Sequence, residues 1–202
     1  MNKQKNIFPH IEGIIKKDQK EAFLKQKALV VWMTGLSGAG KTTIANFIEK
    51  ELYKRGYFTQ IFDGDYIRDG LNQDLDFTIK GRTENIRRIA EVCKLFVNCG
   101  VIVFSCFVSP TKKMRDLAKS IIGEENFIEV YVNSPLIVCE KRDTKGLYAR
   151  ARSGEIKNLT GVNAIYEAPI NPDIELKTDV LTIEQTVEKL IDNILPKITY
   201  SK

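Results

Sequence analysis

The sequence predicts an α/β fold in which helices cover both faces of a parallel β-sheet. Three observations support this prediction. Apolar, strand-like runs alternate along the chain with segments of helical periodicity. The run at 101–108 is almost continuously apolar, as expected of a strand buried on both faces. A glycine-rich loop at 35–42 lies between the first apolar run and a helical segment. This alternation is typical of three-layer α/β/α folds, which bind ligands at the carboxyl ends of their strands.

The loop after the first predicted strand has a phosphate-binding pattern. An apolar run at 28–33 precedes it, and a helical segment follows from Thr43. That context distinguishes the loop from a chance glycine-rich turn. Its backbone N–H groups can bind phosphate, Lys41 adds a cation, and Thr42 offers a hydroxyl to Mg²⁺. The residues predicted to bind a nucleoside triphosphate are Gly35, Leu36, Ser37, Gly38, Ala39, Gly40, Lys41, Thr42 and Thr43, of which the first eight fit G-x-x-x-x-G-K-[ST].

The other elements follow from the same periodicities. Ser109 is expected to be an N-cap with Pro110 as the first helical residue, and the final helix is expected to follow a capping box at Thr182 to Gln185. The predicted strands are 57–62, 101–108, 127–132 and 173–177, and the predicted helices are 43–52, 84–98, 109–123, one from 134 and one after 182.

The chain is expected to form one P-loop domain at 28–202 behind an N-terminal arm at 1–27. Residues 143–171 are polar and rich in basic side chains, and they lack a sustained periodicity. A solvated surface loop is one interpretation of this segment. A long loop in a compact domain is often an active-site lid. Because phosphoryl transfer requires neutralised charge and excluded water, we interpret the segment as a basic lid.

Composition excludes several classes of function. The chain has 31 basic and 26 acidic residues among 202, giving a net charge of +5, and no basic run interleaved with aromatics, so no nucleic-acid partner is expected. The longest apolar runs are far below the ~20 residues that span a bilayer, so no membrane partner and a cytoplasmic location are expected. Cys93, Cys99, Cys106 and Cys139 show no C-x-x-C pairing and are predicted to be reduced core thiols. The only histidine, His10, excludes sites that need two histidines.

Several longer motifs together identify a family. They are DGDYIRDGLN at 63–72, RTENIRRIAEV at 82–92, FVSP at 107–110, CEKRD at 139–143, KGLY at 145–148 and GEIKN at 154–158. In this order they closely resemble adenylylsulfate kinases, and the similarity runs from about Asn6-Ile7 and His10 to residue 195. The resemblance implies a P-loop NTPase fold and transfer of the ATP γ-phosphoryl group to the 3′-hydroxyl of adenylyl sulfate (APS). The products would be 3′-phosphoadenylyl sulfate (PAPS) and ADP, in sulfate assimilation.

Two carboxylates, Asp63 and Asp65, lie where the second predicted strand ends beside the phosphate loop. One of them can accept a hydroxyl proton while the other orients the hydroxyl or holds metal-bound water. The resemblance implies Asp63 as the base, and Asp65 as the metal or ribose partner with Thr42 as the second metal ligand. The alternative is an Asp-Gly-Asp turn that only ends a strand.

The resemblance also implies the remaining site residues. Lys41 and Arg142 would act on the nucleotide, and Ser109 matches a serine described in some accounts of the family as a phosphoserine intermediate, the helix cap being the alternative. Phe77 would stack on the APS adenine unless it is a core phenylalanine. Leu159 stands where the family usually has a second phenylalanine, so one stacking ring is missing. The implied substrate-binding residues are Asp65, Arg68, Phe77, Arg82, Asn85, Val108, Lys145 and Leu159.

The family further implies ATP and Mg²⁺ as cofactors, a homodimer, and functional coupling to ATP sulfurylase. The residues alone are compatible with two other functions. One is a kinase of another small hydroxyl compound, such as a nucleoside or a sugar acid. The other is a nucleotide-sensing module without turnover. Because the chain lacks an Asn-Lys-x-Asp guanine-reading motif and retains the candidate base and lid cations, the sensing module is disfavoured.

Overall fold

The computed structural model describes residues 13–201, and it confirms a three-layer α/β fold. Its sheet has five strands in the order β2-β3-β1-β4-β5, and every neighbouring pair is parallel. Asn6, Ile7 and His10, which belong to the implied family similarity, lie outside the described residues. The strands are β1 (Val30–Thr34), β2 (Thr59–Asp63), β3 (Ile102–Cys106), β4 (Phe127–Asn133) and β5 (Ile174–Lys177).

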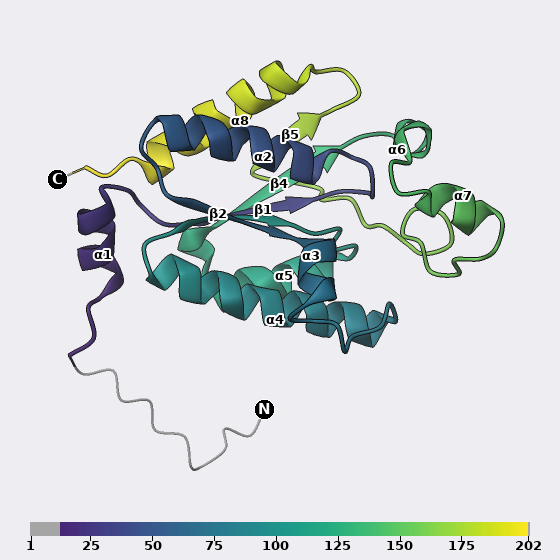
Figure 1. Ribbon diagram of the computed structural model, residues 1–202, viewed down its shortest axis with the longest axis horizontal. Coiled ribbons are helices and arrows are strands. Elements are labelled where there is room, and N and C mark those ends of the chain that lie inside the picture. The colour runs from purple at the N-terminus through teal and green to yellow at the C-terminus, as the bar shows by residue number, and fades with distance from the viewer. Residues whose placement is uncertain (1–12, 202) are drawn as a thin grey trace, which may run out of the picture.

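Helices cover both faces of this sheet. Helices α2 and α8 lie on one face and α4 and α5 on the other, while α6 and α7 lie beyond the carboxyl ends of the strands (Figure 1). The helices are α1 (Lys17–Leu24), α2 (Lys41–Lys54), α3 (Gly64–Asp69), α4 (Ile79–Asn98), α5 (Lys112–Ile122), α6 (Leu136–Arg142), α7 (Leu147–Arg152) and α8 (Ile183–Ile198), with a 3₁₀ turn at Glu124–Asn126.

The central strand β1 divides the interior into two cores. Val31 and Met33 belong to the α2/α8 core, which also contains the buried apolar faces of those two helices. Val30 and Trp32 belong to the α4/α5 core on the opposite face. Successive side chains of a strand point to opposite faces, so a strand covered by helices on both sides is expected to be largely apolar. Strands β1 and β3 are buried along their whole length, and their residues are apolar except for Thr34 and Ser105.

The structure corrects the predicted start of α5. Its N-cap is Thr111, whose side chain accepts a hydrogen bond from Met114 N, so the prediction that Ser109 caps this helix is wrong. Ser109 has a left-handed φ of 38°. Its hydroxyl accepts a hydrogen bond from Trp32 Nε1 at 3.1 Å. The serine hydroxyl is thus a hydrogen-bond acceptor for a core tryptophan and does not cap the helix. The helix begins two residues after Pro110, at Lys112.

Other predictions about the helices and cysteines have mixed outcomes. Helix α4 begins at Ile79, five residues before the predicted start, and is capped by Thr78. The capping box of Thr182 and Gln185 is confirmed, with both of its hydrogen bonds present. Cys99 is exposed at the end of α4, so only the other three cysteines are the buried thiols that were predicted.

The buried side chain of Gln26 connects the segment after α1 to the sheet. Its Nε2 donates to Phe58 O at 2.9 Å and Gly100 O at 2.7 Å, and its Oε1 accepts from Phe58 N at 2.8 Å. Because the amide is fully buried, these bonds satisfy backbone groups that water cannot reach.

We predict that Gln26→Ala lowers the free energy of unfolding by about 2–4 kcal/mol, because buried polar groups lose their partners. Gln73→Ala, at an exposed position, serves as the matched control and should change stability by less than about 0.5 kcal/mol. Denaturant unfolding of the two variants measures the difference. Equal stabilities would show that the Gln26 amide contributes nothing beyond an exposed one.

Candidate active site

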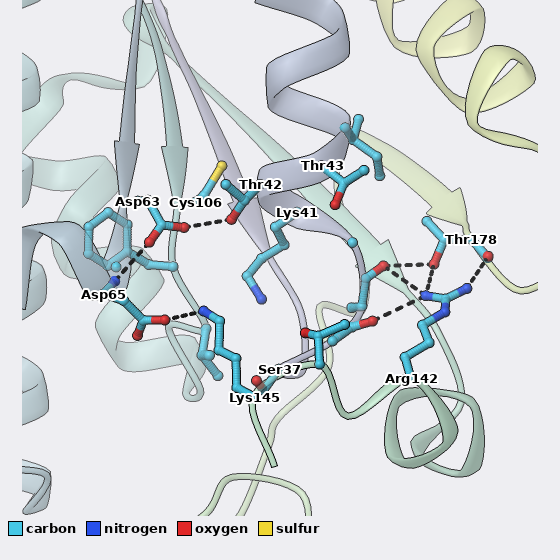
Figure 2. Close-up of a pocket in the computed structure, with 18 of the residues that line it drawn as sticks. Ser37, Lys41, Thr42, Thr43, Asp63, Asp65, Cys106, Arg142, Lys145 and Thr178 are labelled. Carbon is cyan, nitrogen blue, oxygen red and sulfur yellow. Dashed lines mark hydrogen bonds and ion pairs between the residues drawn. The ribbon is translucent and has the colours of Figure 1, made fainter. Parts of the chain in front are cut away.

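A cleft of about 540 Å³ opens at the carboxyl ends of the strands. It is formed by the phosphate loop with the start of α2, the start of α3, the loop after β3, the region after α6, and the region from the end of β5 to α8 (Figure 2). Most of the predicted nucleotide and catalytic residues are brought together here. The predicted residues that line it are Ser37, Gly38, Ala39, Gly40, Lys41, Thr42, Thr43, Asp63, Asp65, Val108, Arg142 and Lys145.

The phosphate loop holds Lys41 at the centre of this cleft (Figure 2). At Gly35 a Cβ atom would lie 2.4 Å from the carbonyl oxygen of Val132, so only glycine permits the turn out of β1. The Lys41 Nζ donates to Gly35 O at 2.9 Å and to Leu36 O at 2.8 Å. Burial disfavours the charged ammonium and lowers the pKa of Lys41 to about 8. Gly35 and Leu36 themselves do not line the cleft.

Asp63, the last residue of β2, is fixed beside the phosphate loop. Its Oδ2 accepts a hydrogen bond from the Thr42 hydroxyl at 2.5 Å. Its Oδ1 accepts from the backbone N–H groups of Asp65 at 3.0 Å and Tyr66 at 3.4 Å, so it is the N-cap of α3. These bonds hold the Asp63 carboxylate in one orientation at the edge of the cleft.

Asp65 has a different partner. Its Oδ2 forms an ion pair with Lys145 Nζ, which comes from the region after α6 (Figure 2). Both side chains are exposed, and the bond to Asp65 raises the pKa of Lys145. The carboxylate next to Thr42 is therefore Asp63, whereas the sequence interpretation had grouped Thr42 with Asp65 as metal ligands.

On the other side of the cleft, Arg142 is fastened to the phosphate loop and to the end of β5. Its Nη1 donates to Gly38 O at 3.2 Å, and its Nη2 donates to Thr178 O at 2.6 Å. The Thr178 hydroxyl in turn donates to Ala39 O at 2.8 Å. Sequence analysis did not identify Thr178. Its position directly after a strand of the parallel sheet was the signal that could have found it.

A second group of predicted residues surrounds Phe77 and is not part of the cleft lining. The guanidinium carbons of Arg68 and Arg82 lie 4.3 Å and 5.6 Å from the centroid of the Phe77 ring. Arg82 also donates from Nη2 to Asn158 O at 2.5 Å and from Nη1 to Thr160 Oγ1 at 2.9 Å. Phe77 is 58% exposed, so the alternative of a core phenylalanine is wrong.

Three further predicted residues lie in more enclosed surroundings. Asn85 is only 4% exposed, and its Oδ1 accepts from Asn72 Nδ2 at 3.0 Å. Leu159 is half-buried against the α2/α8 core. Ser109 is 2% exposed with its hydroxyl bonded to Trp32. None of the three lines the cleft.

The segment predicted as a lid is anchored to the phosphate loop by Tyr148 in α7. Its hydroxyl donates to Ser37 O at 2.8 Å, and burial raises the pKa of the phenol, which keeps it a neutral donor. The Asp143 carboxylate accepts from the N–H groups of Tyr148 and Ala149 at the start of α7. Sequence analysis counted Tyr148 only as part of the KGLY motif and did not assign it to the site, because the motif does not show which group the tyrosine contacts.

Among residues 13–201, no helix combines the length and the apolar character that crossing a membrane requires.

Comparison with known proteins agrees with this architecture. The family model described as adenylylsulphate kinase matches residues 27–177. An adenylyl-sulfate kinase of Bacteroides fragilis is 48% identical over 98% of both chains, and one of Phocaeicola vulgatus is 50% identical over 96% of this chain and 95% of its own. The solved APS kinase of Mycobacterium tuberculosis, in complex with AMPPNP and APS, is 40% identical with a TM-score of 0.81 and covers 84% of this chain and 98% of its own. The chain therefore belongs to the adenylylsulfate kinase family and is an ATP-dependent kinase.

Proposed function

We propose that the protein transfers the γ-phosphoryl group of ATP to the 3′-hydroxyl of APS, giving PAPS and ADP. The observation that supports this most directly is the meeting of a phosphate loop with two carboxylates in one cleft. Lys41 and Thr42 come from the loop, and Asp63 and Asp65 come from the end of β2. Phosphoryl transfer needs little covalent chemistry from a protein, so positioned cations and a positioned base account for the catalysis.

ATP would bind with its phosphates on the phosphate loop. The Lys41 ammonium, now bonded to two loop carbonyls, would exchange them for phosphate oxygens. Arg142 and Thr178 would form the wall on the nucleotide side, because they are held against the carbonyls of Gly38 and Ala39. These contacts place fixed positive charge where negative charge accumulates during transfer.

APS would bind toward Phe77 on the other side of Asp65. The exposed ring offers a face for an adenine, and Arg68 and Arg82 offer guanidinium groups for the phosphosulfate anion. Asn85, whose side chain is buried and hydrogen-bonded to Asn72, would contribute an amide to the binding of APS. Lys145 would follow the transferred phosphoryl group from its present place beside Asp65.

Asp63 is the proposed base, since its carboxylate lies at the edge of the cleft next to Thr42. The residues present also fit Mg²⁺. The described residues contain no cluster of three or more His, Cys, Asp or Glu side chains that could hold a metal ion. Mg²⁺ typically takes one or two protein oxygens and completes its shell with phosphates and water. Thr42 and Asp63 would hold it, and it would supply positive charge that neutralises the phosphate groups.

Ser109 is proposed to support the site rather than to carry a phosphoryl group. Its hydroxyl is buried and already accepts the indole N–H of Trp32. A phosphorylated side chain would bring a dianion into that enclosed place, which is costly unless the charge is paired.

A homodimer and functional coupling to ATP sulfurylase stay predictions that rest on the family resemblance, and a cytoplasmic location stays a prediction that rests on the short apolar runs of the sequence. Such coupling would fit the reaction, because the acceptor must be made by an enzyme that joins sulfate to an adenylyl group.

The function is tested by measuring ADP release with APS and with a panel of nucleosides and sugar acids. We expect turnover with APS only, and a fall of about 10²-fold or more in Lys41→Ala, because the variant loses its phosphate-binding cation. Faster turnover with another hydroxyl compound would show that the acceptor substrate is that compound and not APS. Near-normal turnover by folded Lys41→Ala protein would contradict the mechanism.

A second prediction separates the two carboxylates. Asp63→Asn removes the proton acceptor at nearly constant size, so kcat should fall by about 10²–10⁴-fold and the Mg²⁺ requirement should rise. The matched variant Asp65→Asn loses the ion pair with Lys145 and should change kcat by less than about tenfold. Steady-state kinetics over a Mg²⁺ titration gives both quantities. The reverse ranking would make Asp65 the base.

A third prediction concerns protons. Burial lowers the pKa of Lys41 to about 8, so at pH 9 most of the amine is neutral. Bound phosphates favour the charged form and raise this pKa, so nucleotide binding at pH 9 should take up nearly one proton, and at pH 7 almost none through this group. Calorimetry in buffers of different ionisation enthalpy measures the uptake, with Lys41→Met as the control. Equal uptake by wild type and control at pH 9 would refute the assignment.

A further inference from the structure

The loop after β3 contains an unfavourable backbone conformation next to the cleft. Ser109 has a φ of 38°, which is uncommon for a residue with a Cβ atom and persists only where surrounding contacts enforce it. Val108 and Phe107, just before it, line the cleft beside Gly64 and Asp65. The conformation at Ser109 thus determines the position of the Val108 side chain in the part of the cleft that is proposed to bind APS.

Contacts with core residues help to hold Ser109 in this backbone conformation. Trp32 Nε1 donates to the Ser109 hydroxyl at 3.1 Å, and the buried Arg115 donates from Nη1 to Ser109 O at 3.0 Å. Arg115 is itself paired with Glu129 at 2.7 Å. These contacts fix Ser109 from the α4/α5 side of the sheet.

The other contacts come from two consecutive residues at the end of the lid segment, Tyr166 and Glu167. The Tyr166 hydroxyl lies 3.1 Å from Thr34 Oγ1, which donates its one proton to Val108 O at 2.7 Å. Tyr166 must therefore be the donor in the first bond. Burial raises the pKa of the Tyr166 phenol, so it keeps that proton. Through Thr34, the tyrosine holds the residue that precedes Ser109.

Glu167 holds the residues that follow Ser109. Its backbone N–H donates to Pro110 O at 2.7 Å. Its side-chain Oε2 accepts from Lys112 N, the first residue of α5, also at 2.7 Å. A carboxylate at this place satisfies a helix N–H that has no partner within the helix. Tyr166 and Glu167 thus contact the loop on both sides of the strained residue.

We propose that Tyr166 and Glu167 are positioning residues for the acceptor substrate. They transmit the position of the lid to the loop 107–111 and keep Val108 against the bound acceptor. The proposal rests on the proposed function, because it assigns the acceptor side to APS. ATP would contact the phosphate loop, Arg142 and Thr178 instead, so changes at Tyr166 and Glu167 should affect the two substrates unequally.

The first test compares Michaelis constants. In Tyr166→Phe, which loses only the hydroxyl, the KM for APS should rise about fivefold while the KM for ATP stays within about twofold. Tyr131→Phe is the matched control, because the Tyr131 ring stacks on Tyr166 at 6.2 Å while the bond to Thr34 comes from Tyr166. Unchanged constants, or an equal rise for both substrates, would overturn the proposal.

Glu167 gives an independent comparison. Glu167→Gln keeps an oxygen that can accept from Lys112 N, so its KM for APS should stay near that of the wild type, whereas Glu167→Ala should raise it as Tyr166→Phe does. If Glu167→Ala does not fold, Tyr166→Phe and Glu167→Gln still decide the matter. A Glu167→Gln variant whose KM for APS rises as much as that of Glu167→Ala would overturn the positioning role of this hydrogen bond.

The chain also contains a reporter that does not require turnover. Trp32 is the only tryptophan, and its indole is bonded to Ser109. Its fluorescence in the folded, substrate-free protein should change in Tyr166→Phe and not in Tyr131→Phe. If the wild type does not phosphorylate APS, the proposed function fails, and this signal alone decides whether Tyr166 positions the loop. Identical Trp32 emission in both variants would then refute the positioning role.

Discussion

The active site depends on the close approach of the phosphate loop to strand β4. A side chain at Gly35 would collide with the carbonyl oxygen of Val132, a fully buried residue in strand β4 that is packed on all sides. Without that side chain, the backbone turns sharply out of β1 and α2 begins at Lys41, directly behind the loop. This turn brings the Thr42 hydroxyl to Asp63 at the end of β2, and it exposes the loop carbonyls that Arg142 contacts. One backbone contact therefore fixes both walls of the cleft.

Sequence predicted the elements whose signal is local. The buried strands, the phosphate loop and the capping box at Thr182 each depend on residues within a few positions of one another. Ser109 shows where this reasoning fails, because Ser-Pro resembles a helix start but the serine hydroxyl is bonded to Trp32, 77 positions away. Thr111 has the same capping chemistry and takes that role. A local preference was overridden by a contact that only the folded sheet creates.

Motifs supplied the site residues, but not their pairing. Asp63 bonds to a residue 21 positions away, and Asp65 pairs with one 80 positions away, because the strand order and the path of the segment after α6 decide which groups meet. Phe77 was ambiguous from sequence, since an aromatic residue serves equally well in a core or on a binding surface. In the structure the ring is 58% exposed, and the guanidinium groups of Arg68 and Arg82 lie beside it. Two positive charges beside the ring make that surface favourable for anions.

The ion pair between Asp65 and Lys145 connects the end of the second strand to the segment predicted as a lid, and it would bear on the energetics of any movement of that segment. In the proposed reaction Lys145 leaves one anionic partner for another of greater charge, so no stage requires an isolated cation. An exchange of this kind would lower the barrier to movement of Lys145. Because both side chains are exposed, dissolved salt weakens the attraction between Lys145 and Asp65. After transfer, the phosphoryl group that Lys145 would follow belongs to the product PAPS. The return of Lys145 to Asp65 would then accompany the release of that product.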